Sequence, residues 1–231
     1  CYIFEVGNVF YKSSEFIQEE ILNGAIFGNK KFGAWVNSGK DNDLNYYEAR
    51  GKLKEALSSL NIKVDDKPTN SIDFLHPGRT AKLFIEGKDA GYFGEIHPKL
   101  ILDKTALKKV YLFSINVANL LGASTRKNKW IPIYKQYPIV PKMERDINFI
   151  FSKEHLISEI TSEIRKTGKN LLEDVNLIDV FKDINFGEDF ISYTFRLSYR
   201  DKDKTLLDSD ISSIHSNIVS KVEKRFNTKL R

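Results

Sequence analysis

The chain has 231 residues and a formal net charge of +5 at pH 7. A hydrophobic content of 41% and a charged content of 29% are ordinary for a soluble globular protein with a buried core. No apolar run approaches the roughly 18 residues that a membrane-spanning helix needs, which excludes that class. The single cysteine, Cys1, excludes an internal disulfide and fits a reducing compartment. Because the first residue is not methionine, we expect a piece of a longer polypeptide that begins inside a strand.

The positive charge is unevenly distributed. Residues 1–136 hold 20 lysines and arginines against 15 acidic residues, while residues 137–231 hold 16 of each. A basic total often marks a nucleic-acid-binding protein, but here the second part of the chain is neutral. The densest basic cluster, Arg126, Lys127 and Lys129, is best interpreted as a solvated linker.

The first part of the chain reads as strands with helices packed on them. Strands are predicted over 1–10 and 21–27, followed by a turn-rich loop over 37–42 and a helix over 46–60, which is broken by residues 65–70. After these come a hairpin over 81–96, a short helix over 98–102 and a strand over 109–115. Leu53, Leu57 and Leu60 recur at helical spacing, which predicts the longer helix.

The hairpin is predicted to turn at Gly87-Lys88-Asp89. After residue 123 the pattern dissolves into polar and basic residues. We therefore expect an antiparallel sheet with helices over residues 1–128, followed by a linker over residues 129–136.

A second domain is predicted over residues 137–231. It opens with YPIVPKMERDINFIF at residues 137–151, where two X-Pro steps favour extended backbone. The alternation that follows places Ile147, Phe149 and Phe151 on one face of a strand.

The remaining elements of this domain follow in a regular order. Strands are predicted over 145–151, 172–181 and 191–200, helices over 153–167 and from 208, and the start of a fourth strand at 230–231. Ser152 and Gly168 are the expected caps of the first helix, and Asp208 is the expected N-cap of the second. The order βαββαβ is that of a ferredoxin-like fold, so the whole chain is predicted to be α+β. Right-handed crossovers place both helices on one face and leave the other face open.

Side-chain alternation predicts which residues line this open face. Ile178 and Val180 are expected to point toward the helices, which would turn Leu177 outward. The predicted open face consists of Asn148, Asp179, Phe181, Ser192, Thr194 and Arg196. An aromatic ring among small polar groups suits unstacked RNA bases. However, any antiparallel sheet has one solvent-facing side of this composition, and the neutral charge favours that simpler interpretation.

No pattern in the sequence indicates catalysis. His76 and His97 could meet at one end of the hairpin, but Glu95 is the only further ligand nearby, so turn and packing roles are favoured over a metal site. His215 lies on the apolar stripe of the last helix and is expected to be a core histidine with a hydrogen-bond partner. We expect no catalytic residue, no metal ligand and no cofactor in this chain.

Several motifs resemble the beta subunit of bacterial phenylalanyl-tRNA synthetase. YPIVPKMERDINFIF, LLEDVNLIDVF, and YRD followed by TLLD are similar to its C-terminal anticodon-binding domain, which is ferredoxin-like. Upstream, FEVGNVF, HPGRTAKL, GEIHPKL and VYLFSI are similar to the preceding module, which resembles a class II synthetase catalytic domain without its catalytic residues. The resemblance covers nearly the whole chain in the same order.

This resemblance implies part of a cytoplasmic ligase that attaches phenylalanine to its tRNA with ATP and Mg²⁺. The first domain would pack against the alpha subunit in an (αβ)₂ heterotetramer, and the second would bind the anticodon region. The alpha subunit would carry the chemistry, so this chain alone would be non-catalytic. The editing site and the magnesium ligands would lie upstream of Cys1.

The family pattern assigns anticodon contacts to Asn148, Asp179, Phe181 and Ser192, and the alternation argument adds Arg196. Phe181 lacks the hydroxyl that is often present at its position, so it keeps stacking but loses a hydrogen bond. Asn148 replaces what is often a small apolar residue. The alternative function is a protein interaction scaffold with no RNA contact.

Overall fold

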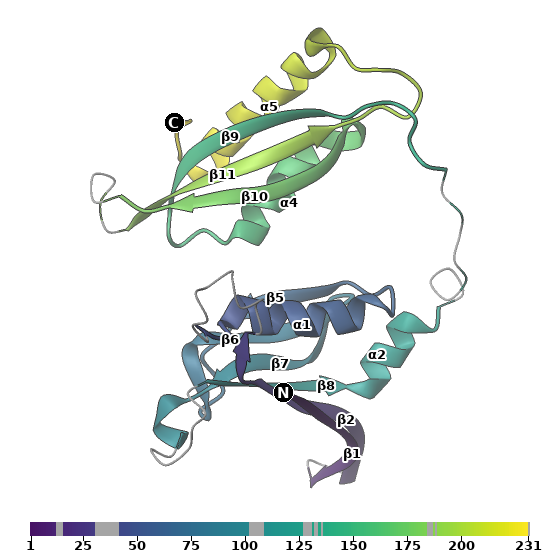
Figure 1. Ribbon diagram of the computed structural model, residues 1–231, viewed down its shortest axis with the longest axis vertical. Coiled ribbons are helices and arrows are strands. Elements are labelled where there is room, and N and C mark those ends of the chain that lie inside the picture. Colours follow the sequence, from purple (N-terminus) through teal and green to yellow (C-terminus); the bar gives the residue numbers. More distant parts are fainter. Residues whose placement is uncertain are drawn as a thin grey trace. The chain divides into compact units, whose positions relative to one another are not determined.

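The computed structural model of the chain describes residues 1–12, 16–30, 42–101, 109–126, 131, 134, 136–183, 187 and 189–230. The chain forms two compact units, Cys1–Tyr134 and Lys135–Arg231, each with its own hydrophobic core (Figure 1). The predicted linker and the predicted loop over 37–42 lie mostly outside the described residues. The domain boundaries at 128 and 137 therefore stay predictions.

The first unit is built on a six-stranded antiparallel sheet with the order β1-β2-β8-β7-β6-β5. Its strands are β1 (Tyr2–Lys12), β2 (Phe16–Phe27), β5 (Val64–Pro68), β6 (Leu75–Ile85), β7 (Lys88–Ile96) and β8 (Val110–Asn116). Two short strands, β3 (Asn29–Lys30) and β4 (Asn42–Asp43), pair separately, and a 3-10 turn, η1, spans Pro98–Leu100.

Two helices, α1 (Tyr46–Ser58) and α2 (Val117–Ser124), pack on the sheet. Asn45 starts α1 through a capping box: its side chain accepts from the Glu48 amide at 2.9 Å, and the Glu48 carboxylate accepts from the Asn45 amide at 2.9 Å. Leu53 and Leu57 of α1 are buried with the sheet residues Phe93 and Tyr111, as the helical spacing predicted, whereas Leu60 lies beyond the end of the helix and is 36% exposed.

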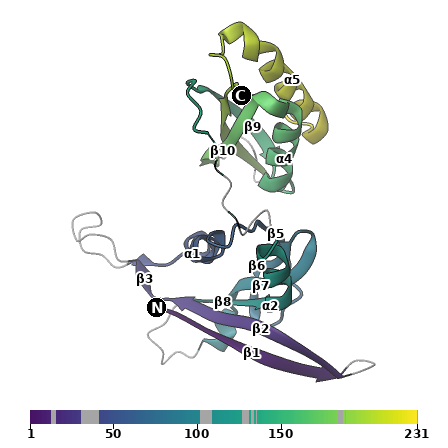
Figure 2. The same cartoon turned by 90° about the vertical axis from the view of Figure 1, so that its right-hand side faces the viewer.

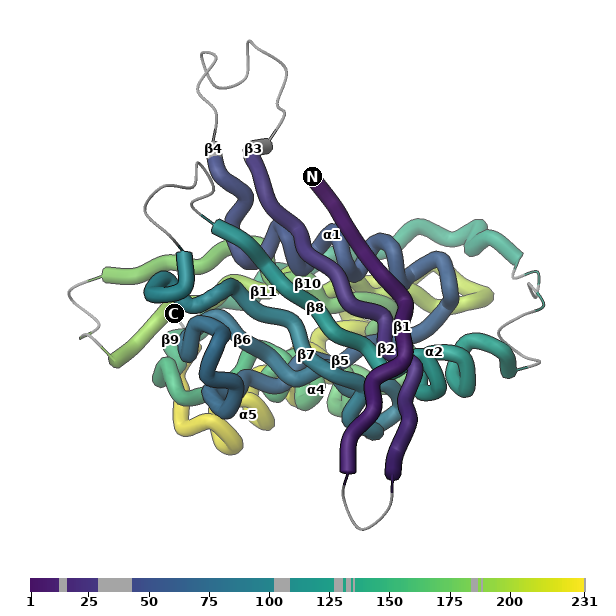
Figure 3. Tube along the Cα trace, turned by 90° about the horizontal axis from the view of Figure 1, so that it is seen from below, coloured from purple at the N-terminus to yellow at the C-terminus, as the bar shows by residue number. Residues whose placement is uncertain are grey.

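The β1–β2 hairpin extends beyond the rest of the sheet (Figures 2 and 3). Strand β8 pairs with β2 only along Ile21–Phe27, so the far half of the hairpin is a two-stranded ribbon within the described part of the unit. Strand β1 is the edge of the sheet.

Several details of the first unit differ from the sequence-based expectations, and both β2 and β6 begin earlier than predicted, at Phe16 and Leu75 instead of residues 21 and 81. Ile85 pairs with Lys88, so the β6–β7 turn is Glu86-Gly87 and not Gly87-Lys88-Asp89; both turn residues have positive φ, as a tight two-residue hairpin turn requires. Residues 64–68 form the edge strand β5 where only a helix break was expected. Helix α2 was missed because eight residues carry too short a pattern.

The second unit has the predicted ferredoxin-like order. Its elements are β9 (Met143–Ser152), α4 (Ile157–Gly168), η2 (Lys169–Leu171), β10 (Leu172–Phe181), β11 (Phe190–Tyr199) and α5 (Asp208–Phe226). The sheet order is β10-β11-β9, and a single bridge between Phe149 and Leu230 stands in place of the fourth strand. Helices α4 and α5 pack together on one face (Figure 2). The α+β class and the open face are thereby confirmed.

The helix caps of this unit are not the predicted ones. The N-cap of α4 is Leu156; Ser152 is the last residue of β9, and its hydroxyl accepts from the Glu154 amide at 3.4 Å in the turn that follows. Gly168 is the last residue of α4 and not a cap beyond it. At α5 the carboxylate of Asp210, not of Asp208, accepts from the backbone N–H of Leu207 at 3.0 Å.

Candidate nucleic-acid interface

The open face of the second unit gathers the outward side chains of three strands into rows. In one row, Asp179 of β10, Thr194 of β11 and Asn148 of β9 lie side by side. The next row holds Phe181, Ser192 and Ile150 in the same strand order. The inward residues of β11, by contrast, are buried in the core. The structure therefore brings together four of the five predicted site residues within two adjacent rows.

A β-bulge in β10 decides which side chains reach this face. Leu177 pairs with Phe195 and Asp179 pairs with Thr194, so Ile178 is an extra residue without a partner opposite it. Leu177 consequently faces the helices and packs against the core, and Ile178 is 44% exposed. The predicted outward Leu177 and inward Ile178 are both wrong. The bulge restores the alternation by residue 179.

Asn148 is tied to two hydroxyls of the neighbouring strand. Its amide nitrogen donates to Thr194 Oγ1 at 2.7 Å, and its amide oxygen accepts from the Ser192 hydroxyl at 2.8 Å. Although Ser192 lies on the open face, it is only 1% exposed. Both ends of the Asn148 amide and the proton of the Ser192 hydroxyl are thus engaged within the sheet before any ligand arrives.

Arg196 is held by a carboxylate of its own sheet. Its guanidinium donates twice to Asp146, at 2.8 and 2.9 Å, in the bidentate geometry that such pairs favour. The hydrogen bonds from Arg196 lower the pKa of Asp146, and Asp146 in turn raises the pKa of Arg196. A phosphate would have to compete with Asp146 for this cation.

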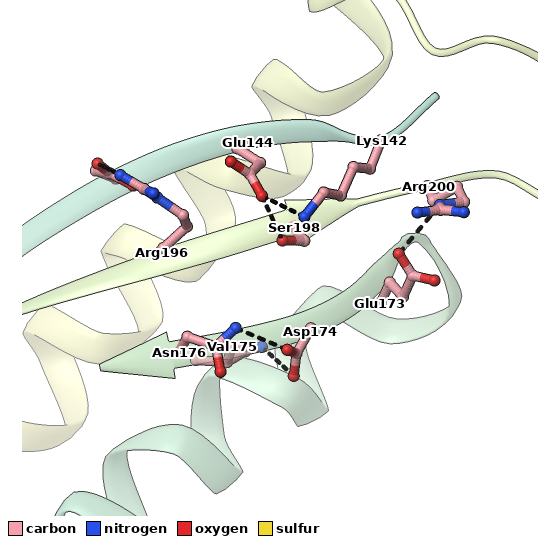
Figure 4. Close-up of polar contacts among 10 residues, drawn as sticks. Lys142, Glu144, Glu173, Asp174, Val175, Asn176, Arg196, Ser198 and Arg200 are labelled. Atoms are coloured by element: carbon pink, nitrogen blue, oxygen red, sulfur yellow. Dashed lines mark hydrogen bonds and ion pairs between the residues drawn. The ribbon is translucent and has the colours of Figure 1, made fainter. Parts of the chain in front are cut away.

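At the end of the sheet away from Phe181, charged side chains also form ion pairs with one another (Figure 4). Lys142 lies 2.6 Å from Glu144, which also accepts from the Ser198 hydroxyl at 3.3 Å. Arg200 pairs with Glu173 at 3.1 Å. These internal pairs leave this side of the sheet with little uncompensated charge, in keeping with the neutral total of residues 137–231.

Asp179 and Phe181 differ from these residues. Asp179 is exposed, and its carboxylate has no hydrogen-bond or ion-pair partner among the described residues. Phe181 keeps 43% of its surface exposed. This end of the open face therefore offers an acceptor beside an aromatic ring, the pair of groups that can bond to and stack on a base. Their RNA contacts, and those of the other predicted site residues, stay predictions.

His76, His97 and His215 have structural contacts. His76 Nδ1 accepts from the Gly78 amide at 3.0 Å, and His97 Nδ1 accepts from the Lys99 amide at 3.2 Å, so each closes a turn. Glu95 is buried and accepts from Arg79. Nowhere in the described ranges do three His, Cys, Asp or Glu side chains gather as metal ligands. His215, as predicted, has a partner: its Nδ1 lies 3.0 Å from the Tyr199 hydroxyl.

A second surface, which the sequence reasoning did not identify, lies on the first unit. A groove of about 580 Å³ opens between the β1–β2 hairpin and α1, and its walls are almost entirely apolar. Tyr2, Phe4, Leu22, Leu53 and Leu60 are among its lining residues. Phe4 is 75% exposed although phenylalanine is normally buried. The sequence feature that could have revealed this groove is the run YIFEV, in which apolar residues occur on both faces of an edge strand.

No helix in the part of the chain that the structure describes is long and apolar enough to cross a membrane.

Comparison with known families assigns most of the chain. Residues 138–231 match the ferredoxin-fold anticodon binding domain, and residues 1–117 match the phenylalanyl tRNA synthetase beta chain CLM domain. The chain is 81% identical to a phenylalanine–tRNA ligase beta subunit of Prochlorococcus marinus (strain MIT 9312). It is 44% identical to that of strain NATL2A and 40% identical to that of Synechococcus sp. (strain CC9902). Each alignment covers 100% of this chain but only 28 or 29% of the relative.

Proposed function

Because the chain belongs to the family of phenylalanine–tRNA ligase beta subunits, we propose that its second unit binds the anticodon region of the phenylalanine tRNA and that its first unit packs against the alpha subunit. The chain spans about 28% of the length of the curated relatives that it matches. In this proposal the alpha subunit carries out ATP- and Mg²⁺-dependent aminoacylation in the cytoplasm, within an (αβ)₂ heterotetramer. This chain contributes binding and assembly and no catalytic residue.

The observation that supports RNA binding is that the exposed Asp179 and Phe181 lie in adjacent rows at one end of the open face. The ring offers a flat surface on which a base can stack, and the carboxylate can accept from a base N–H. Because the cations of this sheet are internally paired, stacking and hydrogen bonding carry recognition here, and the excess positive charge of residues 1–136 supplies attraction to the RNA backbone.

A filter-binding titration of the full chain with a phenylalanine tRNA transcript tests this half of the proposal. Phe181→Ala and Asp179→Ala should each weaken binding on the order of tenfold, the usual range for losing one stacked or bidentate base contact. Leu207→Ala and Asp203→Ala are the matched controls, since both remove exposed side chains that do not belong to the open-face rows. Binding that survives both open-face changes would mean that the open-face assignment is wrong.

The apolar groove supports the assembly half of the proposal. Exposed apolar patches of this kind mark protein interfaces more often than nucleic-acid interfaces. Phe4→Asp places a charge at the groove and should abolish co-purification of the chain with the alpha subunit. Tyr47→Asp is the control, because Tyr47 is an exposed aromatic of α1 that does not line the groove. Equal capture of alpha by both variants would exclude the groove as the subunit surface.

The alternative, a protein interaction scaffold without RNA contact, draws support from the internally paired open face. It predicts that the phenylalanine tRNA binds no better than an unrelated tRNA, while alpha is still captured. The same titration and co-purification separate the two functions.

A further inference from the structure

We propose that Asn148 is a positioning residue that fixes the direction of the Thr194 hydroxyl, so that the open face presents a hydrogen-bond donor next to the acceptor Asp179. Thr194 then becomes a specificity-determining residue for the bound RNA. This inference rests on the proposed RNA-binding function and deepens it.

The hydrogen bonds of Asn148 determine which hydroxyl protons on β11 are in use. A hydroxyl has one proton to donate and two lone pairs that accept, while an amide nitrogen can only donate. Asn148 Nδ2 donates to Thr194 Oγ1 at 2.7 Å, so the Thr194 oxygen accepts there and its own proton remains available. The Ser192 hydroxyl donates to Asn148 Oδ1 at 2.8 Å, so its proton is already used. One amide therefore gives two hydroxyls on the same strand opposite roles.

Burial decides which hydroxyl a ligand can reach. Ser192 is 1% exposed and lies beneath its neighbours, whereas Thr194 is only partly buried. No described group accepts the Thr194 proton, because the hydroxyl's one contact in this part of the chain is the bond from Asn148. Thr194 is thus the hydroxyl whose proton is free for a ligand.

The register of β10 against β11 determines which side chains lie next to the Thr194 hydroxyl. Thr194 lies directly opposite Asp179, whose exposed carboxylate accepts hydrogen bonds. Phe181 lies in the next row along β10. The three residues suit an RNA base that stacks on the ring, donates an N–H to Asp179 and offers a neighbouring carbonyl oxygen or ring nitrogen to Thr194.

A purely structural role for Asn148 makes a different prediction, and Asn148→Asp separates the two. A carboxylate at this position accepts from both hydroxyls and turns the Thr194 proton inward, while the sheet keeps a bridging group of the same size. If Asn148 only holds β9 to β11, Asn148→Asp keeps this bridge and should not change the contribution of Thr194 to binding.

The test is a double-mutant cycle read by filter binding of the full chain to a phenylalanine tRNA transcript at fixed salt. Thr194→Val should weaken binding roughly two- to tenfold, the range for one net hydrogen bond. Asn148→Asp should weaken it at least as much. In the Asn148→Asp background, Thr194→Val should cause no further loss, because the proton is already turned away.

Two controls isolate the donor. Asn176→Asp adds the same charge in the neighbouring row, opposite Arg196, but also removes the hydrogen bond from Asn176 to Asp174; Asn176→Ala removes that bond alone, so the difference between the two variants gives the electrostatic share of the Asn148→Asp effect. Thr194→Ser keeps the hydroxyl and should bind like the unaltered chain. If Thr194→Val lowers the folded fraction by circular dichroism, Thr194→Ala replaces it in the cycle.

The outcomes distinguish this inference from the function on which it rests. Unchanged binding by Thr194→Val, or additive losses in the cycle, would overturn the role of Asn148 and Thr194 while Phe181→Ala still weakens binding. If Phe181→Ala and Asp179→Ala also bind normally, RNA binding by the open face has failed as a whole.

Discussion

The two units expose sheets of opposite character. The first leaves large apolar side chains in water on its edge hairpin, with Phe4 75% and Phe16 84% exposed. The second buries most aromatics of its strands between sheet and helices, with Phe181 among the exceptions, and covers much of its open face with polar groups that bond to one another, such as Asp146 with Arg196. Net charge is therefore a poor guide to their roles: the unit with the positive excess carries the apolar surface that suits a protein partner, and the neutral unit carries the polar face that suits RNA.

The largest effect is expected from a substitution in the second core, which tests whether the two cores unfold independently. Phe149 is fully buried in the second core, and Phe149→Ala should lower the free energy of unfolding of that unit by about 3–5 kcal/mol. Hydrogen exchange read by mass spectrometry should show lost protection in β9–β11, α4 and α5 only. Loss of protection in β6–β8 as well would mean that the units unfold together. Phe93→Ala, in the first core, is the mirror experiment.

A backbone substitution probes the first unit alone. Gly91 has a φ of +136°, and a Cβ there would lie 1.9 Å from the carbonyl oxygen of Ser114 on β8. Gly91→Ala should therefore destabilise the first unit by more than about 1 kcal/mol. Gly122→Ala is the matched control: its Cβ meets nothing within 4 Å inside α2, so it should stabilise by roughly 0.5–1 kcal/mol. Urea denaturation followed by circular dichroism measures the free energy of unfolding of both variants. If Gly91→Ala and Gly122→Ala changed it equally, the close approach of β7 to β8 would be contradicted.

A third change sharpens the contrast in electrostatics. Asp146→Asn releases Arg196 toward the open face and should tighten tRNA binding while increasing its salt dependence by about 0.7 in the log–log slope, the share of one added contact to single-stranded RNA. Stability should change by less than about 1 kcal/mol because the pair is exposed. Glu159→Gln removes the same charge from the helix side and should leave the slope unchanged. If both variants have the same slope, Arg196 does not reach the RNA.

The smallest expected effect is a pH dependence of the second unit. Burial, and secondarily the positive charge of Arg145, lower the pKa of His215 below its ordinary value near 6.5. The unfolded chain therefore binds the proton more readily, and stability should be full above about pH 6.5 and decline as the pH falls below it. The loss should stay under about 1 kcal/mol, since the ring is only half-buried.

Melting temperatures at pH 7.5, 6.5 and 5.5 measure this decline. His215→Gln should flatten the change between pH 7.5 and 5.5 relative to the unaltered chain. A parallel decline in both proteins would show that His215 does not contribute.

Local pattern was enough to predict most of the elements, though not α2 or β5, and the orientation of most strands. Phe195 and Tyr199 are buried and Asp179 and Phe181 lie on the open face, as alternation requires. Leu177 was misplaced because the bulge inserts one residue, and only pairing with β11 reveals where that insertion falls. Side-chain alternation therefore gave the wrong orientation at Leu177 and Ile178 and the right one again from Asp179.

The bonding state of the candidate site was beyond sequence reasoning. Asn148 and Arg196 were singled out as contacts, but their present partners, Thr194 and Asp146, are 46 and 50 residues away in sequence. Such partners depend on the register of β9 against β11, which residue types alone do not specify. The apolar groove was missed for the same reason, since it forms only where α1 approaches the hairpin.

The edge position of β1 has a consequence for self-association of the chain. Its outer backbone N–H and C=O groups face no neighbouring strand in the described sheet, and apolar side chains flank them. An unpaired apolar edge is a template for strand addition by another copy. Self-association of the chain should therefore rise with its concentration and fall when a partner covers β1. If the alpha subunit covers β1, as proposed above, then balanced synthesis of the two chains would keep the uncovered form scarce and protect against aggregation.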